Sequence, residues 1–409
     1  MRSMFSSRLA VSFALIFVSV GYGQASPDSI YRYLGSHIDD VEAVAASPNN
    51  TFFASGSWDR TISVFSNDSN FSMFQSLWGH NAAVSALAFS RDGKNLISGG
   101  KDYKVIVWKL NEETKQFDVA KQISMVHTAG INCVLYGPGM RNVYSAGDDG
   151  RIMIYDLVKE SSKIIENKIP IRSIALSTNR RFIYCADEST TVKQYDGLGN
   201  MVKEFKGHSD YVNSVAYSID NKYLVTGSND KTAIIWDVNT GKVKRTLKGH
   251  QWKVNSVAIS ADSKYVATAS NDGTVKFWNM ESGELLKTFQ SGGESVRSVA
   301  FSADQKLIIG GIHLDPLDDR EYGPILWQTG VERKVVVPTI RKLPVKAPTN
   351  NAVGAGNNRA TPGGGVGNQT TTTSKPVSTS NSQAKTGNSN KKVVNKTDEV
   401  EVFIEEEPD

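Results

Sequence analysis

The sequence predicts an all-β protein made of seven consecutive units, each of four short antiparallel strands. One pattern of alternating apolar and polar residues recurs seven times between Ser36 and Trp327. The pattern is rich in β-branched residues, and Gly, Asn and Asp separate its parts, which is typical of strands joined by hairpin turns. An aromatic residue near the end of each unit returns every 40 to 49 residues, which fits one four-stranded blade of a closed ring. These aromatic residues are Phe65, Trp108, Tyr155, Tyr195, Trp236, Trp278 and Trp327.

The N-terminus has the three-part form of a secretory signal peptide. Arg2 and Arg8 precede an apolar run from Leu9 to Val20, and small residues follow. The run is shorter than the roughly 20 residues that a membrane-spanning helix needs. We therefore expect residues 1–23 to be cleaved, the mature chain to be exported to the periplasm or secreted, and no transmembrane span to remain in it. An uncleaved membrane anchor is the alternative.

The repeats are expected to occupy residues 24–330, and the composition changes beyond them. Residues 331–347 contain prolines that predict an extended segment. Residues 348–397 are dominated by Asn, Thr, Ser, Gly and Lys, a composition that cannot bury a core and predicts a disordered tail. Residues 398–409 are acidic around a short apolar alternation. This last stretch is either a solvated end or a motif that adds a strand to a partner's sheet.

Paired Gly-His and Trp-Asp motifs carry a resemblance to a known family. Gly-His pairs open several units, and Trp-Asp closes one of them; together they resemble the motifs of the WD-repeat family. The resemblance covers about 300 residues and implies a seven-bladed β-propeller whose ring is closed by an N-terminal strand, which we expect at residues 30–34. It is specific for the fold and says little about function, because such folds serve many binding roles. The motifs are Gly79-His80, Gly207-His208, Gly249-His250 and Trp236-Asp237.

The resemblance further implies a structural tetrad of hydrogen-bonded side chains in each regular blade. A His, a Ser or Thr, an Asp and a Trp would satisfy one another's buried polar groups, which are costly when unpaired. The complete sets are His80, Ser98, Asp102 and Trp108 in blade two; His208, Thr226, Asp230 and Trp236 in blade five; and His250, Thr268, Asp272 and Trp278 in blade six.

The other four blades depart from this pattern. Blades one and three carry Phe65 and Tyr155 in place of Trp. Blade four lacks the His and has Cys185 and Ser189 at the next two positions, so we expect it to be the least rigid blade. Blade seven also lacks the His. The sets with a replaced Trp are completed by His37, Ser55 and Asp59 in blade one, and by His127, Ser145 and Asp149 in blade three.

No catalytic, metal or cofactor site is predicted. Ser or Thr, His and Asp recur together in five units, which is typical of a structural network, whereas catalysis needs one site. Cys133 and Cys185 lack metal-ligand spacing. His313 lies in the oxygen-rich loop 313–322. This loop is either solvated, a contact for a partner, or a calcium site. Against calcium, the spacing of its acidic residues matches no EF-hand, and Arg320 competes for the carboxylates.

These features predict a non-catalytic scaffold that binds one or more proteins of the cell envelope or extracellular space. The net charge is +4 and no dense Lys/Arg block occurs, so nucleic acid is not an expected partner. Membrane association would be peripheral, through a partner. One alternative is an exported propeller enzyme or ligand-binding protein, which needs convergent polar groups at a channel mouth. A cytoplasmic adaptor is the other alternative, should the N-terminus not be a signal.

The resemblance also implies where partners dock, on the narrow face around the central channel. The positions involved flank the start of each unit's first strand and precede the turn Asp, and Trp, Tyr and Arg at such positions supply most binding hot spots. Trp58 has the alternative of packing on a neighbouring loop. The predicted partner-binding residues are Trp58, Lys101, Arg172, Tyr211, Asn213, Lys253, Asn255 and Arg297, within a ring that also includes Asp40, Glu42, Ala83, Ser85, Gly130, Asn132, Asp148, Pro170, Glu188, Asn229, Asn271 and Ser295.

Overall fold

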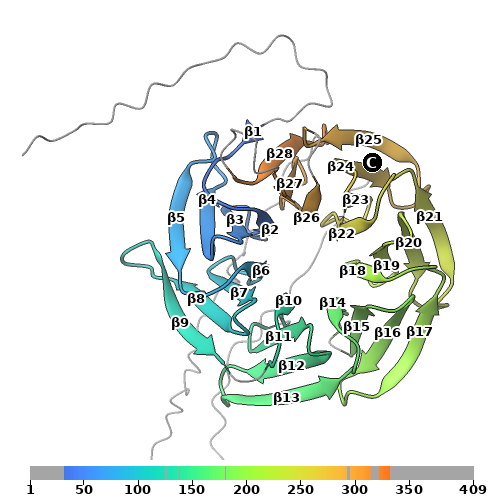
Figure 1. Cartoon of the computed structure of the whole chain (residues 1–409), viewed down its shortest axis with the longest axis horizontal. Coiled ribbons are helices and arrows are strands. Elements are labelled where there is room, and N and C mark those ends of the chain that lie inside the picture. Colours follow the sequence, from blue (N-terminus) through green and yellow to red (C-terminus); the bar gives the residue numbers. More distant parts are fainter. Residues whose placement is uncertain are drawn as a thin grey trace, which may run out of the picture. The chain divides into compact units, whose positions relative to one another are not determined.

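Seven four-stranded antiparallel sheets are arranged around a common axis. The computed structural model describes residues 32–331, apart from 125–126, 138, 180, 293–294 and 315–321. Figure 1 shows the sheets following one another around the ring in chain order, as the blades of a propeller. The described residues contain strands and turns and no helix, so none of them forms a helix that could cross a membrane. The predicted all-β, seven-bladed fold is confirmed.

Six blades are each built from four consecutive strands, with the first strand nearest the axis and the fourth on the outside (Figure 1). Their bounds are β2 (Val41–Ala46), β3 (Phe52–Ser57), β4 (Thr61–Ser66) and β5 (Met73–Trp78); β6 (Val84–Phe89), β7 (Asn95–Gly100), β8 (Val105–Leu110) and β9 (Phe117–Ile123); β10 (Ile131–Tyr136), β11 (Asn142–Gly147), β12 (Arg151–Asp156) and β13 (Ser161–Glu166); β14 (Ile171–Leu176), β15 (Phe182–Asp187), β16 (Thr191–Asp196) and β17 (Met201–Lys206); β18 (Val212–Tyr217), β19 (Tyr223–Ser228), β20 (Thr232–Asp237) and β21 (Val243–Lys248); and β22 (Val254–Ile259), β23 (Tyr265–Ser270), β24 (Thr274–Asn279) and β25 (Leu285–Gln290).

Blade seven joins the two ends of the repeat region. It consists of β26 (Val296–Phe301), β27 (Leu307–Ile312), β28 (Ile325–Gln328) and, as its outer strand, β1 (Arg32–Tyr33). Arg32 pairs with Leu326 and Tyr33 with Ile325. A strand from the N-terminal side therefore closes the ring as predicted, which removes the open sheet edge that would invite aggregation.

The hydrophobic core is divided among the junctions between neighbouring blades. Seven clusters of buried side chains occupy the seven junctions, including the one between blades seven and one. Glycine in the second strand allows the next blade to come close: a Cβ on Gly227 would lie 2.6 Å from Cγ1 of Val254. Because each junction buries apolar surface from two blades, the blades stabilise one another and hold the loops at the ends of their inner strands in fixed positions.

Several predictions concern residues that the structure does not describe. They are the signal peptide at 1–23, most of the segment 331–347, the tail at 348–397, the acidic end at 398–409, and the centre of the loop 313–322. These remain predictions.

Candidate functional site

Every inner strand has a β-bulge at its second residue. In blade five, for example, the pairing of β18 with β19 shifts register between Val212 and Ser214. A bulge takes the intervening residue out of the ladder and re-aims its side chain. All seven bulged residues belong to the ring of face positions predicted from the sequence: Glu42, Ser85, Asn132, Arg172, Asn213, Asn255 and Arg297. The fold thus presents one side chain per blade at the same end of the ring.

Four of the bulged side chains tie their blade to the next one. Each donates a hydrogen bond to the backbone carbonyl of the first residue of the neighbouring inner strand. The amide nitrogens of Asn213 and Asn255, both predicted to bind a partner, are therefore already engaged in the ring. The bonds run from Ser85 to Ile131, from Asn132 to Ile171 at 2.8 Å, from Asn213 to Val254 at 2.9 Å, and from Asn255 to Val296 at 2.7 Å.

The other three bulged residues are charged and have different surroundings. Glu42 accepts a hydrogen bond from Nε1 of Trp58 at 3.2 Å. Arg172 pairs with Glu188 and, at 3.3 Å, with Asp148. Arg297 differs: its Nε is buried without a hydrogen-bond partner among the described residues.

Two lysines complete the charged part of the face. Lys101 is neutralised, because its Nζ lies 3.2 Å from Asp148 and 2.5 Å from Oδ1 of Asn132. Lys253 stands directly before β22 and has no ion pair within the described part of the chain. Burial lowers the pKa of Lys253, the positive charges of Arg297 and Arg172 lower it further, and Glu42 opposes them. The four charges are therefore close enough to interact.

Aromatic side chains on this face are exposed. Trp58 and Tyr211 have exposed fractions of 53% and 47%. Trp58 is thus available to solvent, although its indole nitrogen is engaged with Glu42. Trp252 is 63% exposed and sits beside Lys253, with the ammonium group of Lys231 5.9 Å from its ring centroid. The sequence analysis missed Trp252, although a Trp directly beside a predicted face position was a signal in the sequence.

His313 also belongs to this ring, which the sequence analysis did not recognise. Its backbone N–H donates to the carbonyl of Ser295 at 2.9 Å, as that of Trp58 does to Asp40. Its Nδ1 is hydrogen-bonded to the carboxylate of Asp40. His313 itself contacts blade one, which was not among the three alternatives for the loop 313–322. Those alternatives stay predictions for the loop, because residues 315–321 are not described.

The predicted tetrads lie as hydrogen-bonded chains in blades two, five and six. In blade five, Nε1 of Trp236 donates to Oγ1 of Thr226 at 2.9 Å, which lies 2.7 Å from Nε2 of His208. Nδ1 of that histidine is 2.7 Å from Asp230. Burial alone would raise the pKa of Asp230, but the hydrogen bonds from His208 and Thr232 outweigh it and hold that pKa below its ordinary value. The same chains join His80, Ser98, Asp102 and Trp108, and His250, Thr268, Asp272 and Trp278.

Blades one and three retain the His, Ser and Asp part of the chain. His37 is 2.8 Å from Ser55 and 2.9 Å from Asp59, while His127 is 2.7 Å from Ser145 and 3.0 Å from Asp149. The five histidines are all buried. The Ser and Thr hydroxyl groups bonded to these histidines are buried as well, so a substrate could not reach them.

A different network replaces the missing histidine in blade four, so the reason for expecting this blade to be the least rigid does not hold; its rigidity itself stays a prediction. Asn167 occupies the histidine position, and the acid has moved two residues earlier, to Asp187. The Asn167 amide donates to Asp187 at 2.8 Å and accepts from the Tyr195 hydroxyl at 2.7 Å. Nζ of Lys193 lies 2.5 Å from the same carboxylate, which is fully buried. In blade seven, Trp327 donates instead to the carbonyl of Gln290 at 3.0 Å.

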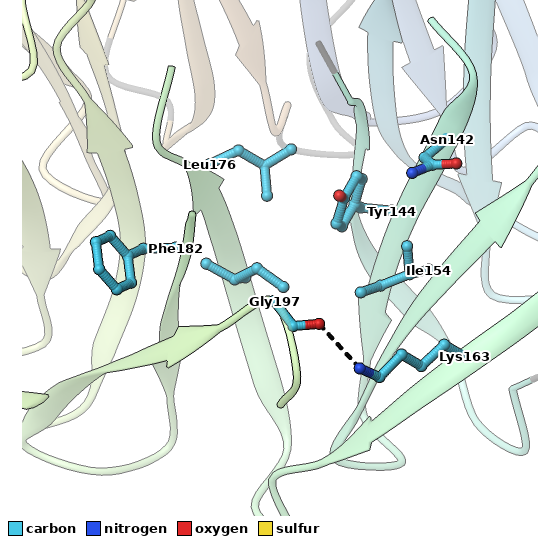
Figure 2. A pocket seen from close by; sticks show the side chains of 8 residues that line it. Asn142, Tyr144, Ile154, Lys163, Leu176, Phe182 and Gly197 are labelled. Atoms are coloured by element: carbon cyan, nitrogen blue, oxygen red, sulfur yellow. Dashed lines mark hydrogen bonds between the residues drawn. The ribbon is translucent and has the colours of Figure 1, made fainter. Parts of the chain in front are cut away.

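The hollow between blades three and four does not fit a small-molecule site. Apolar side chains of Ile154, Leu176 and Phe182 line a cavity between blades three and four (Figure 2). Its volume is about 170 Å³. Its one charged residue, Lys163, already donates to the carbonyl of Gly197 at 2.9 Å. Ligand pockets are usually at least about 300 Å³ and contain several convergent polar groups. No cluster of metal-ligating side chains occurs among the described residues.

Comparison with known proteins identifies the repeats. Five segments match the family model described as "WD domain, G-beta repeat": residues 29–66, 71–109, 121–156, 199–237 and 241–279. These are the five blades that carry the buried His. The chain is 28% identical over 213 residues to "Small ribosomal subunit protein RACK1y" of Oryza sativa subsp. japonica, covering 50% of this chain and 49% of the relative.

Two further relatives show the same partial coverage. "WD repeat-containing protein 18" of Danio rerio is 26% identical over 183 residues, which is 39% of this chain and 42% of the relative. "Nuclear distribution protein nudF" of Aspergillus niger is 24% identical over 211 residues, 51% of this chain and 42% of the relative. The chain spans less than half the length of each of these three relatives.

Proposed function

Starting from a chain that carries WD40 repeats and folds as a seven-bladed propeller, we propose that it is a non-catalytic scaffold that binds partner proteins. Its binding surface is the face formed by the seven bulged residues, the residues two positions before them, and the residues before each turn Asp. The scaffold works outside the cytoplasm, on proteins of the cell envelope or the extracellular space.

One observation carries this proposal: the face combines exposed aromatic rings with charges that the ring itself does not neutralise. Trp58, Tyr211 and Trp252 expose about half of their surface or more, and Arg297 and Lys253 lack ion pairs among the described residues. Aromatic and Arg side chains supply most of the affinity in protein interfaces. By contrast, the sets of Ser or Thr, His and Asp side chains that resemble hydrolytic machinery are buried and repeated five times.

Affinity capture with face variants tests this function. The full-length protein, recovered from its native compartment, should retain specific proteins that the double variant Tyr211→Ala with Arg297→Glu does not. The control is Ile219→Ser, which removes an exposed apolar residue at the opposite end of β18 in blade five. Equal capture by wild type and the double variant would reject the face as the binding surface.

Sequencing the N-terminus of the protein tests its location separately. Export predicts a chain that begins near residue 24 and is found outside the cytoplasm. A soluble intracellular protein that still begins at Met1 would contradict export while leaving the scaffold function intact.

A further inference from the structure

We propose that the part of the face formed by blades six and seven binds an acidic peptide segment of the partner, with a carboxylate between Lys253 and Arg297 and a neighbouring apolar side chain on Trp252. This inference rests on the proposed scaffold function and specifies the chemistry of the partner.

The first argument is the charge balance of the face. The four acidic residues of the ring all have partners: Asp40 with His313, Glu42 with Trp58, and Asp148 and Glu188 with Arg172. Lys101 shares Asp148. Two cations are left without an ion pair in the described part of the chain, Lys253 and Arg297, and they lie on adjacent blades.

The second argument is that the fold holds these two cations close together and partly buried, although they repel each other. β22 and β26 are neighbouring inner strands, joined by the bond from Asn255 to the carbonyl of Val296. Both cations are partly buried, and Nε of Arg297 has no acceptor within the described residues. Burial together with the charges of Arg297 and Arg172 depresses the pKa of Lys253. A carboxylate placed between the two cations would relieve their repulsion and accept hydrogen bonds from both.

The third argument is the apolar surface beside the cations. Trp252 directly precedes Lys253 in the chain and exposes 63% of its surface. In blade five, the position that corresponds to Lys253 is held by Tyr211, which is also exposed. The ring of Trp252 already has the cation Lys231 on it. An isolated small anion would leave this surface unused, whereas a peptide with an aromatic or aliphatic side chain next to its acidic residue would cover it.

Fluorescence anisotropy with defined peptides tests the proposal. The probe is a fluorescein-labelled octapeptide with glutamates on both sides of a Phe-Ile pair, titrated with the full-length protein. We expect saturable binding that weakens as NaCl is raised. A peptide with Gln in place of Glu, and one with Ser in place of Phe and Ile, should each bind at least tenfold more weakly.

Matched variants locate the binding. Lys253→Gln combined with Arg297→Gln should weaken binding of the acidic peptide at least tenfold, and Lys253→Arg should retain it. The control Lys264→Gln removes an exposed lysine at the other end of β22 in the same blade and should change nothing. Thermal melting of each variant checks folding; because Arg297 and Lys253 form no ion pair, their removal should not lower the melting temperature.

Three results would overturn the proposal. They are no binding of the acidic peptide by folded wild type, binding that Lys253→Gln with Arg297→Gln leaves unchanged, and stronger binding of a single-stranded oligonucleotide of equal charge at the same two residues. None of them would reject the proposed binding face as a whole, which fails if Tyr211→Ala with Arg297→Glu captures partners as wild type does.

Discussion

His313 and Asp40 join the last blade to the first one by a side-chain hydrogen bond across 273 residues of sequence. The other oxygen of the same carboxylate accepts from the backbone N–H of Leu314 at 3.2 Å. Together with the pairing of β1 and β28, this contact closes the ring at the binding face. His313 holds in blade seven the position that Trp58 holds in blade one, and it helps to close the ring.

Replacing Asp40 tests that role. Asp40→Ala leaves the Leu314 N–H and the His313 ring without their acceptor, and we expect the free energy of unfolding to fall by about 1 kcal/mol, since the contact is partly exposed. Urea unfolding measures it. The control is Asp39→Ala, which should have less effect, because among the described residues this exposed carboxylate accepts only from the adjacent backbone N–H. Equal loss in both variants would contradict a role in closure.

The hydroxyl of Thr226 is the centre of the tetrad in blade five. Thr226→Val keeps the shape and leaves buried nitrogens of His208 and Trp236 without partners, so unfolding should become easier by about 2–4 kcal/mol. Thr226→Ser retains the hydroxyl and should cost less. Chemical denaturation of the two variants compares them, and a valine variant as stable as the serine variant would show that the hydrogen bonds contribute nothing.

The buried carboxylate of Asp187 makes Lys193 critical in blade four. Lys193→Met removes the ammonium group and leaves a buried charge, which is expected to cost about 3–5 kcal/mol. Asp187→Asn in the same chain removes that charge and should restore much of the loss. Denaturation curves of the single and double variants form the test. Additive losses would mean that the two groups do not interact.

The tetrad acids predict how stability depends on pH. The pKa values of Asp59, Asp102, Asp230 and Asp272 all lie below the ordinary value of 3.8 in the folded chain. A lowered folded-state pKa gives stability that is present above about pH 4 and lost as the pH falls through the folded-state pKa. Asp230→Asn should therefore destabilise the protein at pH 7, and its difference from wild type should shrink below pH 4. A difference that stays constant from pH 7 to pH 3 would be inconsistent with this linkage.

The fold could be predicted from the sequence because each repeat is marked by residues that lie close together in the chain. The spacing of the aromatics, the Gly-His pairs and the turn residues each report on one blade, and the same end of every inner strand had to form one face. The prediction missed the network in blade four, where the usual tetrad is replaced. There Asn167 and Asp187 form a different hydrogen-bonded network, in which the acid lies two residues earlier in the sequence. An Asp near the usual turn position was the signal for this network.

The pairing of charges could not be read from the sequence. Lys101 is neutralised by an acid of the next blade and Lys253 is not. This difference depends on distances between side chains that are 40 or more residues apart in the chain. His313 was missed because the long connection before Trp327 hid its position. Counting 18 residues forward from Ser295, as from Asp40 to Trp58, finds it.

Hydrogen–deuterium exchange of the full-length protein with a captured partner tests the central claim most directly. The account predicts slower exchange in the segments that open β2, β18, β22 and β26, with no change in the turns after those strands. Protection confined to the outer strands β5, β13 and β21, with exchange at the face unchanged, would contradict it.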